Sequence, residues 1–155
     1  MEVKTLSINI AFRGFRIRPS NVKLARDKVT ASFGLCKIEM LPINAYGVVD
    51  EDFEIIRTQK FEGKDIDFEK LMNFTEWGRK YSVKDVNAFT RLYCTDGSYD
   101  RIHHADIFIR ASIYEKDKAK FYDALEHEVM HCLLGAVIPV YRQPATAKKP
   151  RMKSD

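Results

Sequence analysis

Residues 105–134 read ADIFIRASIYEKDKAKFYDALEHEVMHCLL, and this stretch contains both kinds of element from which the fold is built. Apolar side chains first occupy every second position, at Ile107, Ile109, Ala111 and Ile113. That period of two predicts a half-buried strand over 105–113. From Asp117, a good helix N-cap, apolar residues recur at helical spacing until Leu134, and Gly135 ends the helix. The stretch therefore predicts a strand followed by an amphipathic helix.

The rest of the chain alternates between the same two periods. Predicted strands cover 5–12, 36–40, 48–56 and 86–94, and predicted helices cover 19–33 and 68–75. Strands and helices interleaved in this order are typical of an α+β fold, in which a mixed sheet packs against two main helices. We expect a single globular domain over residues 1–142.

Composition supports one domain and a modest charge. The chain has 155 residues, of which 45% are apolar, which is enough for one sizeable core. Its 26 basic and 22 acidic residues leave a net charge of +4, unlike that of a dedicated nucleic-acid binder. Part of the excess lies near the C-terminus, at Lys148, Lys149, Arg151 and Lys153. With no apolar pattern after residue 142, we expect 143–155 to be a disordered basic tail.

Neither targeting nor disulfide signals are evident. The N-terminus lacks the basic flank and apolar block of a secretory signal, and no apolar run could cross a bilayer. Cys36, Cys94 and Cys132 are widely spaced without a CxxC pair, so we expect small buried thiols and a reducing compartment. A cytoplasmic location is the expectation, and a virion-associated protein is an open alternative.

The candidate site is His127-Glu128-Val129-Met130-His131. At about 100° per residue, the two imidazoles lie about 40° apart on one helical face and can reach one ion. The apolar side chains occupy the opposite arc, so we expect the histidines to point away from the buried side. Glu128 lies beside the pair, where its carboxylate can approach the ion without coordinating it.

This spacing suits zinc. The ion binds imidazole nitrogens at about 2.0–2.1 Å, and one helical turn supplies the separation that two such donors need. A zinc site with an open position lowers the pKa of water to roughly 7, and a nearby carboxylate can take the proton. We therefore predict His127 and His131 as ligands of one Zn²⁺ ion and Glu128 as a general base.

Through His127-Glu128-x-x-His131 and the strand before it, the chain resembles the zincin metallopeptidases, with a topology similar to the metzincin branch. The resemblance covers residues 5–135 in topology but only five residues in firm motif. It implies a small zinc-dependent metallopeptidase acting on peptides or proteins. It also implies that 105–113 is an edge strand bordering the cleft, with Ile107 and Ile109 in the substrate-binding region.

The chain departs from that family at the third ligand. The metzincin motif continues as HExxHxxGxxH, whereas here the glycine is one place late at Gly135 and Val137 occupies the last histidine position. No glutamate follows Glu128, so a later glutamate ligand is also excluded. His103 and His104 are the remaining histidines and the candidates for a third ligand.

Two other classes of function stay open. The missing third ligand favours a catalytically inactive zincin-like interaction or assembly subunit, for example in a phage particle, which keeps the fold and a bound ion. Nucleic-acid binding through the basic tail or through basic residues near the N-terminus is the weaker alternative. Those residues are Arg13, Arg16, Arg18, Lys23, Arg26 and Lys28.

Overall fold

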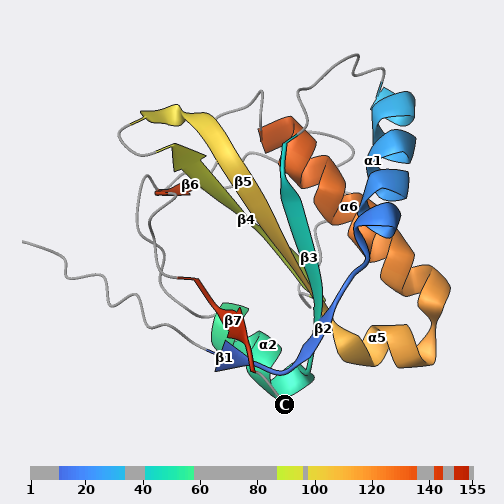
Figure 1. The fold of residues 1–155 in the computed structure, drawn as a ribbon. Helices are drawn as coiled ribbons and strands as arrows, with labels where there is room; N and C mark the ends of the chain where they lie inside the picture. Colours follow the sequence, from blue (N-terminus) through green and yellow to red (C-terminus); the bar gives the residue numbers. More distant parts are fainter. Residues whose placement is uncertain are drawn as a thin grey trace, which may run out of the picture.

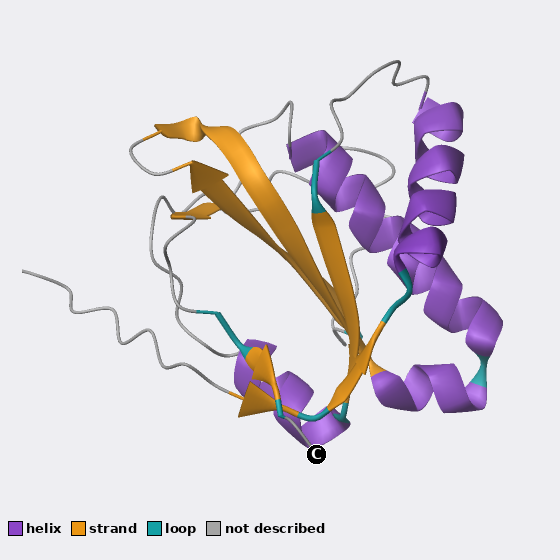
Figure 2. Ribbon diagram, in the orientation of Figure 1, coloured by secondary structure: helices purple, strands orange, loops and turns teal. Residues whose placement is uncertain are grey.

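The computed structural model describes residues 11–33, 41–57, 87–95, 98–135, 142–144 and 149–153 (Figures 1 and 2). The elements are β1 (Ala11–Phe12), β2 (Gly14–Arg16), α1 (Pro19–Phe33), β3 (Ile43–Val48), α2 (Asp50–Arg57), β4 (Ala88–Thr95), β5 (Ser98–Arg110), α5 (Ala111–Lys116), α6 (Lys118–Gly135), β6 (Arg142–Pro144) and β7 (Arg151–Met152). None of the described helices is long and apolar enough to cross a membrane. The predicted elements at 36–40 and 68–75, and residues 5–10 of the first strand, lie outside the described residues.

A mixed sheet forms the centre of the fold. Its five strands follow the order β2-β3-β5-β4-β6. The central strand β5 is parallel to β3 and antiparallel to β4, while β2 and β6 lie at the two edges. A second, two-stranded sheet joins β1 to β7. The predicted α+β class with a mixed sheet is therefore confirmed.

The two faces of the sheet carry different layers, because successive side chains of a strand point to opposite sides. On one face Ala105, Ile107 and Ile109 of β5 pack against α1 and α6. On the other face Phe108 packs with Phe53 of α2 and its neighbours. Figure 1 shows α1 and α6 together on one side of the strands, and α2, β1 and β7 on the other. Both helices predicted from periodicity near 19–33 and 118–134 are confirmed.

Two predictions of local structure are wrong. Residues 48–56, expected as a strand, belong mainly to α2, in which Phe53 and Ile56 are buried at helical spacing. Three acidic residues in its first turn favour a helix because they complement the positive end of the helix dipole. The strand expected to reach Ile113 ends at Arg110, and α5 follows. Ile113 packs against the core from α5, so an apolar residue at this position is compatible with either a strand or a helix.

The prediction of a disordered tail is wrong for its paired segments. Gln143 and Pro144 belong to β6, which pairs in parallel with β4. Arg151 and Met152 pair with β1, and the Lys153 amide donates to the carbonyl of Phe12 at 2.7 Å. Strand pairing uses backbone groups, so these residues need no apolar side-chain pattern to be held.

Two glycines allow β2 and β3 to approach closely. A Cβ atom on Gly14 would overlap the carbonyl oxygen of Gly47, which is backbone and cannot move without disturbing the pairing. A Cβ atom on Gly47 would instead meet the ring of Phe15, which is 36% exposed and can turn away. A side chain at Gly14 would therefore require the backbone to move, whereas a side chain at Gly47 would require only the Phe15 ring to move.

We expect Gly14→Ala to lower the free energy of unfolding by about 2 kcal/mol, because the overlap forces a backbone shift in the β2–β3 pair. Gly47→Ala should cost less than about 1 kcal/mol, because only the Phe15 ring has to move. Urea unfolding of both variants measures the difference. Equal losses at the two positions would contradict this account.

Candidate metal centre

Helix α6 holds the candidate residues against the sheet. Asp117 caps its start, since Asp117 Oδ1 accepts a hydrogen bond from the Lys120 amide at 3.2 Å. The predicted apolar arc is confirmed as buried, with every member at most 2% exposed: Phe121, Leu125, Val129, Cys132 and Leu133. These side chains fix the rotation of α6, and with it the direction of the histidines.

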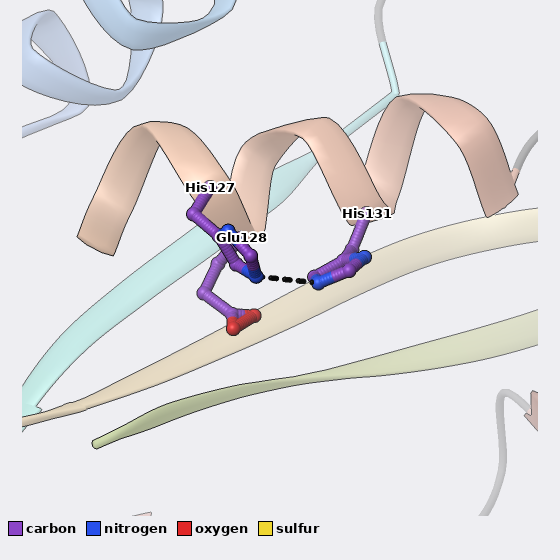
Figure 3. Close-up of side chains that lie close together, drawn as sticks. All are labelled: His127, Glu128 and His131. Carbon is purple, nitrogen blue, oxygen red and sulfur yellow. Dashed lines mark hydrogen bonds between the residues drawn. The ribbon is translucent and has the colours of Figure 1, made fainter. Parts of the chain in front are cut away.

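The three motif side chains meet on one flank of α6. The Nε2 atoms of His127 and His131 are 2.9 Å apart, and the rings are nearly perpendicular, at 82°. A ligand atom from each histidine and from Glu128 all lie within 4.8 Å of one another. Figure 3 shows the three side chains leaving α6 on the side of the strands, with the two imidazole tips facing each other.

The histidines are more enclosed than the sequence indicates. We expected them to point away from the buried side, yet both are half-buried, and the neighbouring Glu128 is only 4% exposed. Met130, outside the predicted apolar arc, is also 2% exposed. The arc of α6 that is buried is therefore wider than its apolar residues predict, because α6 is covered from more than one side.

Thr90 of β4 is a site residue that the sequence analysis did not identify. Its Oγ1 donates to Glu128 Oε2 at 2.8 Å, which ties the carboxylate to the sheet. A signal was present in the sequence: Thr90 is a polar residue between Ala88 and Leu92, in the register that faces α6. A hydroxyl in that register needs a buried partner, and Glu128 supplies it.

Burial sets the protonation states at this site. It lowers the pKa of His127, and it lowers the pKa of His131 to about 3, with the His127 charge contributing. Both imidazoles are therefore neutral at physiological pH, which is the form that binds metals. Burial raises the pKa of Glu128 to about 7, opposed by the hydrogen bond from Thr90. Glu128 can thus gain or lose a proton near neutral pH.

The donor set fits a zinc ion with a small adjustment. Two nitrogens at zinc distance and tetrahedral angle would be about 3.3 Å apart. The observed Nε2–Nε2 distance of 2.9 Å is slightly shorter, so a modest opening of the two rings would admit the ion. In the metal-free form one imidazole N–H can donate to the other at this distance.

The structure does not bring His103 or His104 to the pair. His104 lies opposite Tyr93 in the β4–β5 register, on the face of the sheet away from α6, where its ring stacks on Tyr93 at 4.5 Å. His103 is exposed at the register shift beside it, and the two Nδ1 atoms are 2.7 Å apart. Within the described part of the chain, His127, Glu128 and His131 form the only group with metal-binding geometry.

The predicted substrate strand is also wrong. Over Ala105–Arg110, β5 is paired with β3 on one side and with β4 on the other, so this part of the predicted strand offers no edge to a peptide. Ile107 and Ile109 are both 0% exposed and belong to the core under α6. The alternation that predicted a strand could not show whether its edges were paired, because that depends on distant strands.

Comparison with known proteins adds no relative. No model of a known protein family, no curated protein and no solved structure matches the chain. The resemblance to zincins therefore rests on the motif and its helix.

Glu128→Gln should make the stability of the metal-free protein less sensitive to a rise in pH from about 4.5 to about 7. The raised pKa means that the neutral Glu128 stabilises the fold below its unfolded value of 4.5, and this contribution is lost as the pH rises through about 7. Glutamine cannot ionise. The variant should match the wild type near pH 4.5 and exceed its free energy of unfolding by on the order of 3 kcal/mol above pH 7.

Urea unfolding across this pH range, with a chelator present, measures the effect. The control is Glu115→Gln, which removes an exposed carboxylate from α5. Its difference from the wild type should not grow with pH. If the Glu128→Gln difference is also flat, Glu128 is not buried as the structure has it.

Proposed function

We propose that the protein is a small zinc-dependent hydrolase, with peptides as its substrate class, and that His127, His131 and Glu128 form its active centre. The observation that carries the proposal is the conjunction at one flank of α6 of two neutral imidazoles, 2.9 Å apart at Nε2, with a buried carboxyl whose pKa is about 7. Two paired histidines alone suit a structural ion. A general base tuned to neutral pH has a use in hydrolysis.

Each residue has a defined part in this scheme. His127 and His131 would hold the ion, which when bound acts as a Lewis acid that polarises a carbonyl and acidifies water. Thr90 occupies Oε2 of Glu128, and Oε1 is then the oxygen that takes a proton from water. The low exposure of Glu128 excludes bulk water and keeps the carboxylate basic enough for this transfer.

A second candidate is an interaction or assembly subunit that retains the ion without hydrolysis. It is favoured because neither His103 nor His104 lies near the pair. Among the described residues, the group that could hold a metal ion is His127, Glu128 and His131. The burial of Glu128 to 4% exposure also restricts the approach of a substrate. Measured cleavage separates this candidate from the hydrolase.

Nucleic-acid binding remains the weaker alternative. Several of the basic residues near the N-terminus bond within the chain: Arg13 pairs with Asp52 at 3.2 Å, and Lys28 pairs with Glu126 at 3.1 Å. These contacts occupy charges that a phosphate backbone would need. Binding to random DNA with a steep salt dependence would support this alternative.

Metal analysis tests the ligands. The purified protein should contain close to one zinc ion per chain, and His127→Ala or His131→Ala should reduce the zinc content to background. His104→Ala is the matched control and should keep the metal, because His104 faces the other side of the sheet. Wild-type protein that takes up no zinc after incubation with the ion would refute the metal centre.

Glu128→Gln tests the chemistry separately. The variant should keep its zinc and lose at least about a hundredfold in kcat on unstructured peptides, because the amide cannot accept a proton. Thr90→Val should move the acidic limb of the kcat/KM profile to higher pH, since it removes the hydrogen bond that lowers the pKa of Glu128. Thr90→Ser keeps the hydroxyl and should restore the profile. An active Glu128→Gln variant would contradict the role of this residue.

A further inference from the structure

A groove lies at the β2 end of the molecule, away from the histidines of α6. It has a volume of about 420 Å³. Its apolar lining consists of Ile17 and of four aromatic residues from three elements: Phe15, Tyr114, Phe121 and Tyr122. Phe121 is buried, while Phe15 is 36% exposed and packs edge-on against Tyr114, with ring centroids 5.3 Å apart. The groove thus has a buried aromatic residue at its floor and a partly exposed one at its rim.

Strand β2 presents one backbone edge beside this groove. The Ile17 amide donates to the carbonyl of Ala45, and the Val49 amide donates to the carbonyl of Arg13. The odd-numbered residues of this segment therefore bond to β3. Because these residues alternate in an antiparallel pair, the N–H and C=O groups of Gly14 and Arg16 point away from β3. β2 ends the described sheet on this side, and no described strand pairs with that edge.

The charge of the groove is positive. Arg18 and the backbone of Arg16 line it, and neither aspartate nor glutamate is among its described lining residues. The Arg16 side chain lies on the opposite face of β2 from Phe15, where its guanidinium donates to Asn44 Oδ1 at 3.1 Å. Lys118 lies over the Tyr114 ring at 5.1 Å and adds a cation beside the lining. An occupant with carboxylates would therefore meet complementary charge.

We propose that this groove binds an extended, acidic peptide segment of a partner protein. The segment would add a strand to β2 through the outward backbone groups of Gly14 and Arg16. On one face of the added strand an aromatic or large apolar side chain would contact Phe15 and Tyr114, and on the other face carboxylates would reach Arg16. A carboxylate at the end of the segment would reach Arg18. Arginine and aromatic side chains are the residue types that dominate such contacts. Single-stranded nucleic acid would use the arginines and rings but not the strand edge.

This surface is separate from the proposed active centre. Phe121 precedes His127 by about 9 Å and His131 by about 15 Å along the axis of α6. The groove opens toward β2, whereas Glu128 contacts Thr90 of β4, beyond β3 and β5 in the strand order. Binding here requires no metal and can be measured with a chelator present, so its failure would leave the hydrolase proposal untouched.

The test uses a fluorescein-labelled peptide in which glutamate alternates with valine around a central phenylalanine, measured by fluorescence polarisation. Three matched probes accompany it: the same peptide with lysine for glutamate, the same peptide N-methylated at alternate amides, and labelled oligothymidylate. We expect the acidic peptide to bind and the lysine and N-methylated peptides to bind at least about tenfold more weakly.

Substitutions in β2 separate charge from strand pairing. Arg16→Ala keeps the outward N–H and should weaken binding about threefold. Arg16→Pro removes the N–H as well, without touching the bonds to β3, and should weaken binding about a further fivefold. Arg57→Ala removes an exposed arginine from α2, on the other face of the sheet, and should leave affinity unchanged.

Substitutions in the rings test the apolar part. Tyr114→Ala should weaken binding about tenfold. Gly47→Ala should also weaken it, because a Cβ atom there displaces the Phe15 ring without changing any charge. Unfolding midpoints of all variants confirm that they are folded. The proposal is overturned if the acidic peptide does not bind, if the N-methylated peptide binds equally well, or if oligothymidylate binds more tightly through the same residues.

Discussion

Side-chain alternation along the central strand β5 is the constraint on which the rest of the structure depends. Over Ala105–Arg110 the strand is paired at both edges, and its side chains alternate between two faces that are both covered. Ile107 and Ile109 go to the α6 face and form the floor on which that helix rests. His104 and Phe108 go to the other face, beside Tyr93 and α2. The alternation of side chains along β5 therefore places the isoleucines under α6 and places His104 on the opposite face, away from His127 and His131.

The electrostatics of the candidate centre follow from the way α6 is seated. The same burial that lowers the pKa of His127 and His131 raises that of Glu128, because each shift disfavours a charged form in a region of low exposure. In water the imidazoles would be partly protonated near neutral pH and the carboxylate fully ionised. In the folded protein both imidazoles are neutral, the form that binds metals, and the pKa of Glu128 is about 7. The hydrogen bond from Thr90 opposes the rise in the pKa of Glu128.

The two edges of the sheet differ in how they are paired. At the β4 edge, Leu92–Cys94 pair with β6, which comes from the C-terminal part of the chain. The β2 edge has no strand partner among the described residues and lies beside an aromatic groove rimmed with arginine. An uncovered strand edge is a liability unless it is short or charged, and β2 is both. The aromatic groove and the cations beside this edge are the features that the proposed acidic peptide would use.

The sequence by itself determined the helical context of His127 and His131, the helix α1, the strand character of β4 and β5, and the buried arc of α6. These features depend on local spacing, which a single segment carries. Tertiary structure decided which strand is central, that the C-terminal segments pair with β4 and β1, and that Thr90 meets Glu128. It also decided the faces on which His104 and Ile107 lie. Strand order, edge pairing and burial depend on contacts between residues far apart in the chain, and local periodicity holds no information about them.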